Sequence, residues 1–421
     1  MIHNFFRILI TVILTILGSW LLYFNWPQRL THYDSYSYTD EESHRLRSYP
    51  RAQYAYGMRA WLEQKSERAA KFFKQAVSQN ILFLDAWLKL AETEVAMGHT
   101  EKATDILTFT TNISDKVFRW KWQQTLLALE LGFDEVLYCN ANFLLSHSVL
   151  EPDTLQLLHT HLRGDTSSVI ANLMPEHLVV YLDWLMRWSM TEESLIVWHA
   201  MIEVVEPDKD FSLRYSHFLL DQKRITASKE IWQQYTVTDG LTNPGFEKDI
   251  TGQGFDWIYW GEKDGQWNLK RSKDETAEGE YALKIIFNGR ENISFQHIYQ
   301  IFMTNPGDRY RLTYTTKSQG LTTDQGPFLE IYGYDAKGLY IAGPMITGTQ
   351  GWSEKSLEFD VPEGCRAAVV RVRRLHSNRF NSKIRGTLWL DDFRLEKIGN
   401  ESMQFASEKS ALPFYRGDQA K

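Results

Sequence analysis

Cysteine is scarce in this chain, and the motifs of common catalytic centres are missing. The 421 residues include two cysteines, Cys139 and Cys365, which lie in regions of different pattern, so we expect two buried free thiols rather than a disulfide. No Cys/His cluster has the spacing of a zinc site. The sequence has no Gly-x-Ser-x-Gly elbow, no His-Glu-x-x-His motif and no phosphate-binding Gly-Lys-Ser/Thr loop. These absences exclude the corresponding families, and we predict that the chain is not an enzyme.

An excess of basic charge is also missing. The formal net charge is −7, with 46 Lys and Arg against 53 Asp and Glu, which excludes a generally basic nucleic-acid binder. Aromatic residues are abundant instead, with 15 Trp, 20 Tyr and 23 Phe. Trp and Tyr can form flat platforms on which sugar rings stack, although helical repeats and β-sandwiches also bury large aromatics in their cores.

A long uncharged run begins close to the N-terminus. Ile8–Phe24 contains no charged residue, and Trp20 and Trp26 lie near its far end. Extended from Phe5, the run approaches the length that spans a bilayer. We predict an uncleaved signal anchor at residues 1–27, with a cleaved signal peptide as the alternative. The rest of the chain would then lie in the periplasm or outside the cell, as part of a single-pass protein of a bacterial inner membrane.

A 34-residue offset relates packing positions in the middle of the chain. It pairs Gly57, Ala69, Phe73 and Ala76 with Ala91, Ala103, Leu107 and Thr110. Small residues let the two helices of a hairpin approach, and large ones fill the groove to the next hairpin. The pattern resembles tetratricopeptide (TPR) repeats, and we predict a helical solenoid over residues 51–236 after a linker at 28–50. Such solenoids present concave surfaces to protein partners; a plain helical spacer is the alternative.

The last third of the chain alternates apolar and polar residues in short runs. Tyr281–Phe287 and Phe328–Tyr334 are two such runs, and turns rich in Gly, Pro and Asn separate them from the others. Because side chains alternate across a strand, each run has one core face and one free face. We therefore predict a β-sandwich at residues 241–398, followed by a disordered tail at 399–421.

Several short motifs follow one another along this region. They are Asn243-Pro244-Gly245-Phe246-Glu247, then Trp257 and Trp260, then Gly279–Ile285, the strand at Trp352, and the pair Asp391-Asp392. In this order they resemble carbohydrate-binding modules of the family 4/9 type, which have a galactose-binding-like jelly roll. The resemblance implies polysaccharide binding without catalysis, and a structural calcium held by Glu247 and Asp391. Hard oxygen ligands suit calcium; two ordinary solvated acids are the alternative.

One free strand face is the candidate glycan site. Glu330, Tyr332 and Tyr334 share it, so sugar rings could stack on the tyrosines while the carboxylate takes a hydroxyl. The alternative places both tyrosines under a covering loop or against the solenoid. Arginine forks bind carboxylates and phosphates, although a solvated basic face paired to nearby acids is the alternative for the arginines. The full set of predicted contacts is Trp257, Trp260, Glu330, Tyr332, Tyr334, Arg371 and Arg373.

These regions predict a multidomain chain, α then β: an N-terminal transmembrane helix, an α-helical TPR-like solenoid and a C-terminal β-sandwich jelly roll. We predict a membrane-anchored, exported adaptor that binds polysaccharide through the jelly roll and a protein partner through the helices. This layout looks like that of accessory factors of bacterial exopolysaccharide or O-antigen assembly and export. The alternatives are an interaction scaffold without sugar binding and a degenerate glycoside hydrolase, for which Glu330 is one carboxylate and no second is evident.

Overall fold

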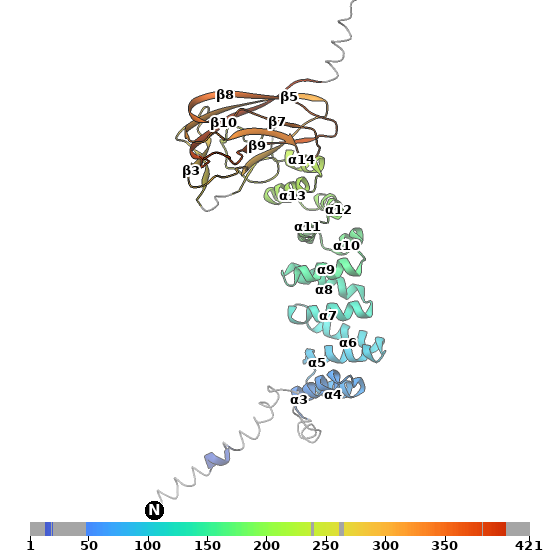
Figure 1. Cartoon of the computed structure of the whole chain (residues 1–421). Coiled ribbons are helices and arrows are strands. Elements are labelled where there is room, and N and C mark those ends of the chain that lie inside the picture. The colour runs from blue at the N-terminus through green and yellow to red at the C-terminus, as the bar shows by residue number, and fades with distance from the viewer. Residues whose placement is uncertain are drawn as a thin grey trace, which may run out of the picture. The chain divides into compact units, whose positions relative to one another are not determined.

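The chain folds as helices followed by two β-sheets, as the sequence pattern predicted. The computed structural model describes residues 13–17, 19, 48–236, 240–260, 265–380 and 382–400, and it separates into two compact units (Figure 1). The first unit runs to Arg187 and resumes over Glu192–Val205. The second comprises Trp188–Thr191 and everything described from Glu206 onward.

The prediction of an N-terminal transmembrane helix is contradicted. Crossing a membrane takes about 20 consecutive apolar residues in a helix, and no helix in the described part of the chain has both the length and the apolar character required. Of the predicted anchor at 1–27, residues 13–17 and 19 are described. The structure therefore does not support a single-pass inner-membrane location.

Of the predicted linker at 28–50 and tail at 399–421, residues 28–47 and 401–421 lie outside the described residues. At the described ends of these two ranges, Pro50 begins helix α3 and residues 399–400 end strand β10.

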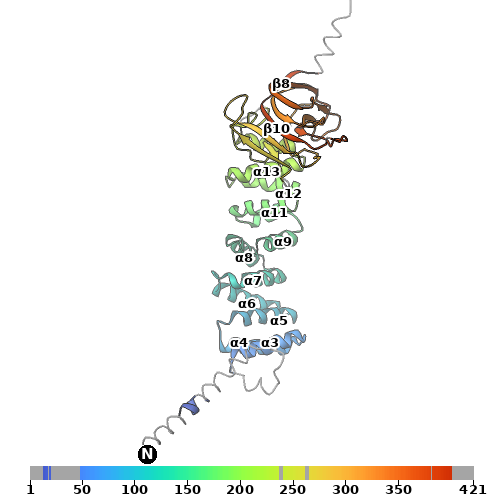
Figure 2. The ribbon, with the colours of Figure 1, turned by 60° about the vertical axis from the view of Figure 1, so that its left-hand side comes forward.

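The first unit is built of short helices that contact mainly their neighbours in the chain. Figures 1 and 2 show these helices stacked as successive layers. They are α3 (Pro50–Leu62), α4 (Ser66–Gln79), α5 (Leu84–Ala96), α6 (Thr100–Ile113), α7 (Phe118–Leu131), α8 (Asp134–Ser146), α9 (Glu151–His161), α10 (Thr166–Asn172), the 3-10 turn η1 (Pro175–His177), α11 (Leu178–Arg187) and α12 (Thr191–Ile202).

The repeated positions of the sequence are the ones that pack between these helices. Phe73 and Leu107, which correspond at the 34-residue offset, are both fully buried. Gly57 faces Phe73, and a Cβ on Gly57 would come within 2.5 Å of the ring, so the approach of α3 to α4 requires glycine. The helical region is thus consistent with repeats, whereas membership in the tetratricopeptide family is not confirmed.

Both cysteines are free, as predicted. Cys365 is buried in the core of the β-sandwich. Cys139 is exposed, which corrects the expectation that both thiols would be buried. It lies on α8 directly before Asn140 and Ala141, which are buried, so it occupies the solvent side of a helix that has a single packed face.

The second unit contains a helical hairpin and two five-stranded sheets. The first sheet has the order β1-β4-β9-β6-β7 and the second the order β2-β3-β10-β5-β8; all assigned neighbours are antiparallel. The elements are α13 (Lys209–Asp221), α14 (Ile225–Gln233), β1 (Trp257–Tyr259), β2 (Trp267–Ser272), β3 (Ala282–Asn288), β4 (Ile298–Met303), β5 (Asp308–Leu321), β6 (Phe328–Gly333), β7 (Tyr340–Ala342), β8 (Gly348–Asp360), β9 (Ala367–Arg373) and β10 (Arg385–Asn400).

The two sheets enclose one hydrophobic core, as in a jelly roll. Leu283, Ile285 and Phe287 alternate along β3 and enter this core from the second sheet, while Leu329 and Ile331 of β6 enter it from the first. The period-two pattern of the sequence therefore identified the inner faces correctly. It follows that the intervening residues of β6 lie on the outer face of the first sheet.

The hairpin α13–α14 packs on part of that outer face. Its apolar side chains share a small core with outward-facing residues of β4 and β9, so these contacts join the hairpin to the sandwich within one unit. The buried members of this core are Leu213, Leu220, Ile225, Trp232, Phe255, Ile301, Ala367 and Val369. We call the part of the face around Ile301, Ala367, Val369 and Tyr334 the covered half, and the part around Trp260, Tyr299, Glu330, Arg371 and Arg373 the open half.

Candidate functional site

Tyr334 belongs to the covered half. Its hydroxyl donates a hydrogen bond to the carbonyl oxygen of Leu220 at 3.0 Å, and Lys223 Nζ lies 3.1 Å from the centroid of its ring. Burial raises the pKa of the Tyr334 hydroxyl above its ordinary value. This arrangement matches the alternative that placed the tyrosine against the helical region. The Tyr334 side chain contacts the hairpin and is not available to a ligand.

Glu330 and Arg371 form the centre of the open half. They are register partners on β6 and β9. Arg371 Nε donates to Glu330 Oε1 at 2.7 Å, Arg371 Nη2 donates to the same oxygen, and Tyr340 donates its hydroxyl to Oε2 at 3.2 Å. The guanidinium carbon also lies 4.7 Å from the centroid of the Tyr332 ring. Arg371 is therefore held in one orientation, and both Glu330 oxygens are engaged rather than free for acid–base chemistry.

Two exposed aromatic side chains flank this pair at opposite edges of the sheet. Trp260, directly after β1, is 52% exposed, and Tyr340 on β7 is 65% exposed. The backbone N–H of Trp260 donates to His297 O at 3.0 Å, and the Trp260 ring centroid lies 5.4 Å from that of Tyr299. The edge strands β1 and β7 are four strand spacings apart, which corresponds to about 19 Å. The open half is thus a strip with an aromatic ring at each end.

Trp257 lies on the other side of β1. It is 0% exposed, its ring centroid is 5.0 Å from that of Phe393 and 5.1 Å from that of Phe246, and its Nε1 donates to Asn243 O at 3.2 Å. Residues three apart along extended chain point to opposite faces, so Trp257 enters the core while Trp260 reaches the surface. Trp257 contributes to packing and makes no part of the open half.

Arg373 lies two residues along β9 from Arg371 and on the same face. Its Nη1 donates to Gln296 Oε1 at 2.7 Å. Other basic residues of this region follow the alternative of pairing with nearby acids: Arg366 with Asp335 and Arg379 with Asp324. The open half therefore brings together Trp260, Glu330, Arg371 and Arg373 of the seven predicted contacts. Tyr332 pairs in register with Val369 of the covered half and, like Tyr334, packs against the core of the hairpin.

Tyr299, Gln296 and Tyr340 are members of the open half that sequence reasoning missed. Tyr340 comes from a strand of three residues, too short for an alternating pattern to be recognised. Tyr299 lies opposite Arg371. Only its position next to Ile298, which is buried, could have indicated from the sequence that Tyr299 lies on the outer face. Gln296 precedes the strand and had no signal of its own.

Glu247 and Asp391, the predicted calcium ligands, are held by backbone amides. Glu247 Oε1 accepts hydrogen bonds from the N–H groups of Glu280 and Tyr281 at 3.0 and 3.1 Å. Asp391 Oδ2 accepts from Ala277 and Glu278 at 2.8 and 3.2 Å, and its Oδ1 accepts from Asp392 at 2.8 Å. Burial raises the pKa of the Asp391 carboxyl. Both carboxylates thus clamp the turn that leads into β3.

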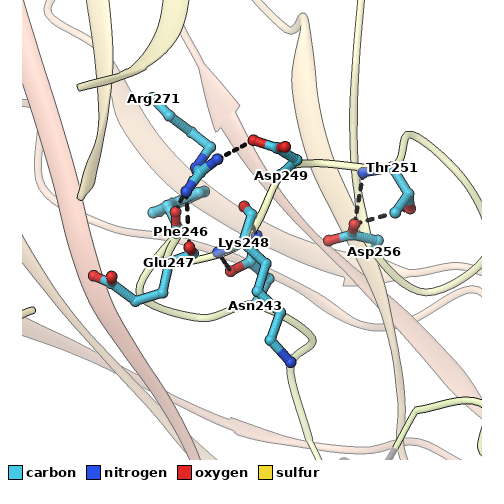
Figure 3. A network of polar contacts seen from close by, with 8 residues as sticks. All are labelled: Asn243, Phe246, Glu247, Lys248, Asp249, Thr251, Asp256 and Arg271. Atoms are coloured by element: carbon cyan, nitrogen blue, oxygen red, sulfur yellow. Dashed lines mark hydrogen bonds and ion pairs between the residues drawn. The ribbon is translucent and has the colours of Figure 1, made fainter. Parts of the chain in front are cut away.

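The backbone carbonyl oxygens beside Glu247 accept hydrogen bonds from an arginine. Arg271 donates from Nε to Phe246 O and from Nη2 to Glu247 O at 2.8 Å, and it pairs with Asp249. Figure 3 shows these contacts, with the Glu247 carboxylate turned away from the guanidinium. Among the described residues no group of three or more His, Cys, Asp or Glu side chains is arranged to hold a metal ion. This donor set does not fit calcium, and we derive no role for one.

Chelation of calcium is expected to leave the melting temperature of the full chain unchanged. Glu247 Oε1 and both oxygens of Asp391 already accept hydrogen bonds from backbone N–H groups, so the two carboxylates are ordered without an ion. An ion that binds only the folded state would raise the melting temperature with its concentration. Melting curves recorded with calcium and with excess chelator check this, and a lower melting temperature in chelator would contradict it.

Comparisons with known proteins give remote likenesses. No protein-family model matches the chain, and no curated protein matches it. Solved structures that are similar to the C-terminal sandwich include a family 61 carbohydrate-binding module in complex with β-1,4-galactotriose, with 20% identity and a TM-score of 0.27 over 38% of this chain and 97% of that one. They also include the CBM22-1 xylan-binding domain from Paenibacillus barcinonensis, with 13% identity and a TM-score of 0.25 over 37% and 92%.

A third similar structure is an enzyme. It is the enzymatically active domain of tailspike protein 4 from bacteriophage CBA120, with 14% identity and a TM-score of 0.29. The match covers 38% of this chain, which spans 21% of the length of the tailspike chain. At these scores the likenesses carry no conclusion about what this chain binds or catalyses. Any functional proposal has to rest on the residues of the open half.

Proposed function

We propose that the second unit is a glycan-binding module that uses the open half of the first sheet. The supporting observation is the strip itself: two exposed aromatic rings, Trp260 and Tyr340, with the fixed Arg371–Glu330 pair between them. Aromatic rings offer an apolar surface to the CH face of a sugar. An arginine held by a carboxylate presents its remaining N–H groups in a fixed direction to sugar hydroxyls.

Replacement of Trp260 by alanine is expected to weaken glycan binding without unfolding the protein. Loss of one stacked ring should cost about 1–3 kcal/mol, by analogy with bases stacked on aromatic side chains, which is roughly a fivefold to 150-fold loss of affinity. The full chain is first screened on a glycan array. The strongest array ligand is then titrated by calorimetry against the wild type and the Trp260→Ala and Tyr340→Ala variants.

Trp188→Ala is the matched control, because Trp188 is also an exposed tryptophan, 61% accessible, but lies outside the sheet. Its affinity should equal that of the wild type. The melting temperatures of the Trp260→Ala and Trp188→Ala variants should also stay unchanged, since both side chains are exposed. Tyr340→Ala should melt at a lower temperature, because it removes the hydroxyl that donates to the buried Glu330. A blank array, or equal affinities of the Trp260→Ala and Trp188→Ala variants, would count against the proposal.

Binding of a protein partner by the helical unit is a second candidate function. Exposed apolar side chains occur at or beside successive turns that join one helix pair to the next, where polar residues are the rule. They are Leu82, Phe118, Leu150, Met174 and Val204. Recurring exposed apolar residues are typical of surfaces that another chain covers. With both functions the chain would be an adaptor, and a role in exopolysaccharide or O-antigen assembly stays a prediction.

A further inference from the structure

The charges of the open half do not balance. Arg371 is neutralised by Glu330, with which it forms an ion pair. Arg373 forms no ion pair with any residue that the structure describes, and its one side-chain hydrogen bond goes to the neutral amide oxygen of Gln296. Among the described residues of this strip, two arginines against one carboxylate leave one positive charge, in a chain whose formal net charge is −7.

This uncompensated cation differs from its neighbours in sequence. Arg366 is paired with Asp335, and Arg379 is paired with Asp324. Arg374 is 0% exposed and donates to backbone carbonyl groups in the interior. In the stretch from Arg366 to Arg379, Arg373 is thus the arginine that keeps both partial exposure and an unneutralised charge within the described structure.

Arg373 is also placed between the aromatic ends of the strip. It lies on β9, two residues from Arg371. Its hydrogen-bond acceptor Gln296 directly precedes His297. The carbonyl of His297 in turn accepts the backbone N–H of Trp260. Burial raises the pKa values of the Tyr332 and Tyr340 hydroxyls, and the positive charges of Arg371 and Arg373 lower them. The charge of Arg373 therefore acts on both hydroxyl groups. A ligand lying across the strands from Trp260 to Tyr340 would therefore pass beside this guanidinium.

We infer that the open half selects glycans that carry carboxylates, with Arg373 as the specificity-determining residue. This inference rests on the proposed function. A guanidinium pairs with a planar carboxylate through two parallel N–H donors. A single uncompensated cation matches the one charge of a uronate residue, whereas a phosphate monoester carries close to two charges. Arg371, which Glu330 already neutralises, is left to bind hydroxyl groups.

The test compares acidic polysaccharides with their neutral counterparts. Alginate, hyaluronan and polygalacturonate are each used in native form and after chemical reduction of the carboxylates to alcohols, which keeps the polymer backbone and removes the charge. Neutral galactan and xylan complete the panel. Affinity electrophoresis of the full chain measures retention by each polymer at low and at high salt.

At least one native acidic polymer should bind about tenfold or more tightly than its reduced form, as expected for loss of hydrogen bonds to a charged group. Arg373→Gln should remove most of that preference, because it should weaken binding of the native polymer more than binding of the reduced one. Arg379→Gln removes the same charge from a loop arginine that is already paired with Asp324, and it should behave as the wild type. Salt should weaken binding of the native polymer more than that of the reduced one.

Four results would overturn the inference. Equal retention of native and reduced polymers, or retention of galactan or xylan with none of the acidic polymers, would leave the proposed function standing and remove the selection for carboxylates. An Arg373→Gln variant that keeps the full preference would move the selection to another residue. Retention of no polymer at all would count against the inference and the proposed function together.

Discussion

Replacement of Trp232 by alanine is expected to lower the free energy of unfolding of the second unit by about 3–5 kcal/mol, the usual cost of truncating a large buried aromatic. Trp232 is buried between the hairpin and the sheet, with its ring edge-on to Phe255 at 6.1 Å. Gly254 lies against the same ring, so closely that a Cβ there would overlap it. The alanine variant would leave a cavity against the outer faces of Ile301 and Val369.

Urea unfolding of the full chain measures this loss, and amide hydrogen exchange locates it. Exchange should increase in α13 and α14 and also in β4 and β9, because the hairpin and the sheet share one core. Trp188→Ala removes an exposed tryptophan and should change stability by less than about 0.5 kcal/mol. Increased exchange confined to the hairpin, with the strands as protected as before, would show that the sandwich does not depend on this contact.

Gly254→Ala gives an independent check of the same contact. Gly254 has a φ of +54°, a region that favours glycine, and the added methyl group would press on Trp232. We expect this variant to be destabilised by roughly 1–3 kcal/mol, as overpacked sites are. In the Trp232→Ala background the second substitution should cost less, because the ring that it would meet is gone.

The hairpin explains why a face could be predicted from the sequence while its accessibility could not. Alternation along β6 separated Leu329 and Ile331 from Glu330, Tyr332 and Tyr334 correctly. It contained no information about which element would pack on the outer side. The apolar residues of α13–α14 follow a helical pattern that fits a repeat as well as it fits a cap on a sheet. Their partners on the sheet begin with Ile301, which is 69 residues after Trp232 in the chain (301 − 232).

Glu330 and the two acids of the predicted calcium site illustrate a similar limit. The sequence placed Glu330 on the outer face, where it lies, but the 3% exposure of that residue follows from the cover that Arg371 and Tyr340 provide. Glu247 and Asp391 were placed near one another by resemblance, and a Cβ on Gly245 would lie within 4 Å of both side chains. What occupies their oxygens is decided by the amide groups of a turn, which no motif specifies.

The membrane prediction was contradicted for a different reason. A hydropathy pattern reports the apolar character of a run, and the run at Ile8–Phe24 has that character. The described part of the chain contains no helix that satisfies length and apolarity together. The architecture that follows, helices and then a two-sheet sandwich, was recoverable because the hydrophobic period changes from that of a helix to that of a strand.

Replacement of Arg374 by methionine is expected to destabilise the second unit by about 3–5 kcal/mol, because it leaves several buried carbonyl oxygens without their donors, each at a cost of about 1–3 kcal/mol. Arg374 is 0% exposed. Its guanidinium donates to Gln325 O at 2.9 Å, to Ser382 O at 2.8 Å and to Ile293 O. Burial lowers the pKa of this guanidinium, and carbonyl dipoles of three separate loops offset the burial of its charge.

Thermal melting and urea unfolding of the full chain check this expectation. Arg379→Met is the control, since Arg379 lies in the same loop, is 77% exposed and pairs with Asp324, a surface contact worth about 0–1 kcal/mol. Arg374→Lys should remain destabilised, because an ammonium group cannot span acceptors that a planar fork reaches at once. Arg373 and Gln296 adjoin these loops, so glycan affinity should fall along with stability in the Arg374 variants. An Arg374→Met variant as stable as Arg379→Met would mean that the three loops hold their positions without the buried guanidinium, and the open half would then not depend on it for its shape.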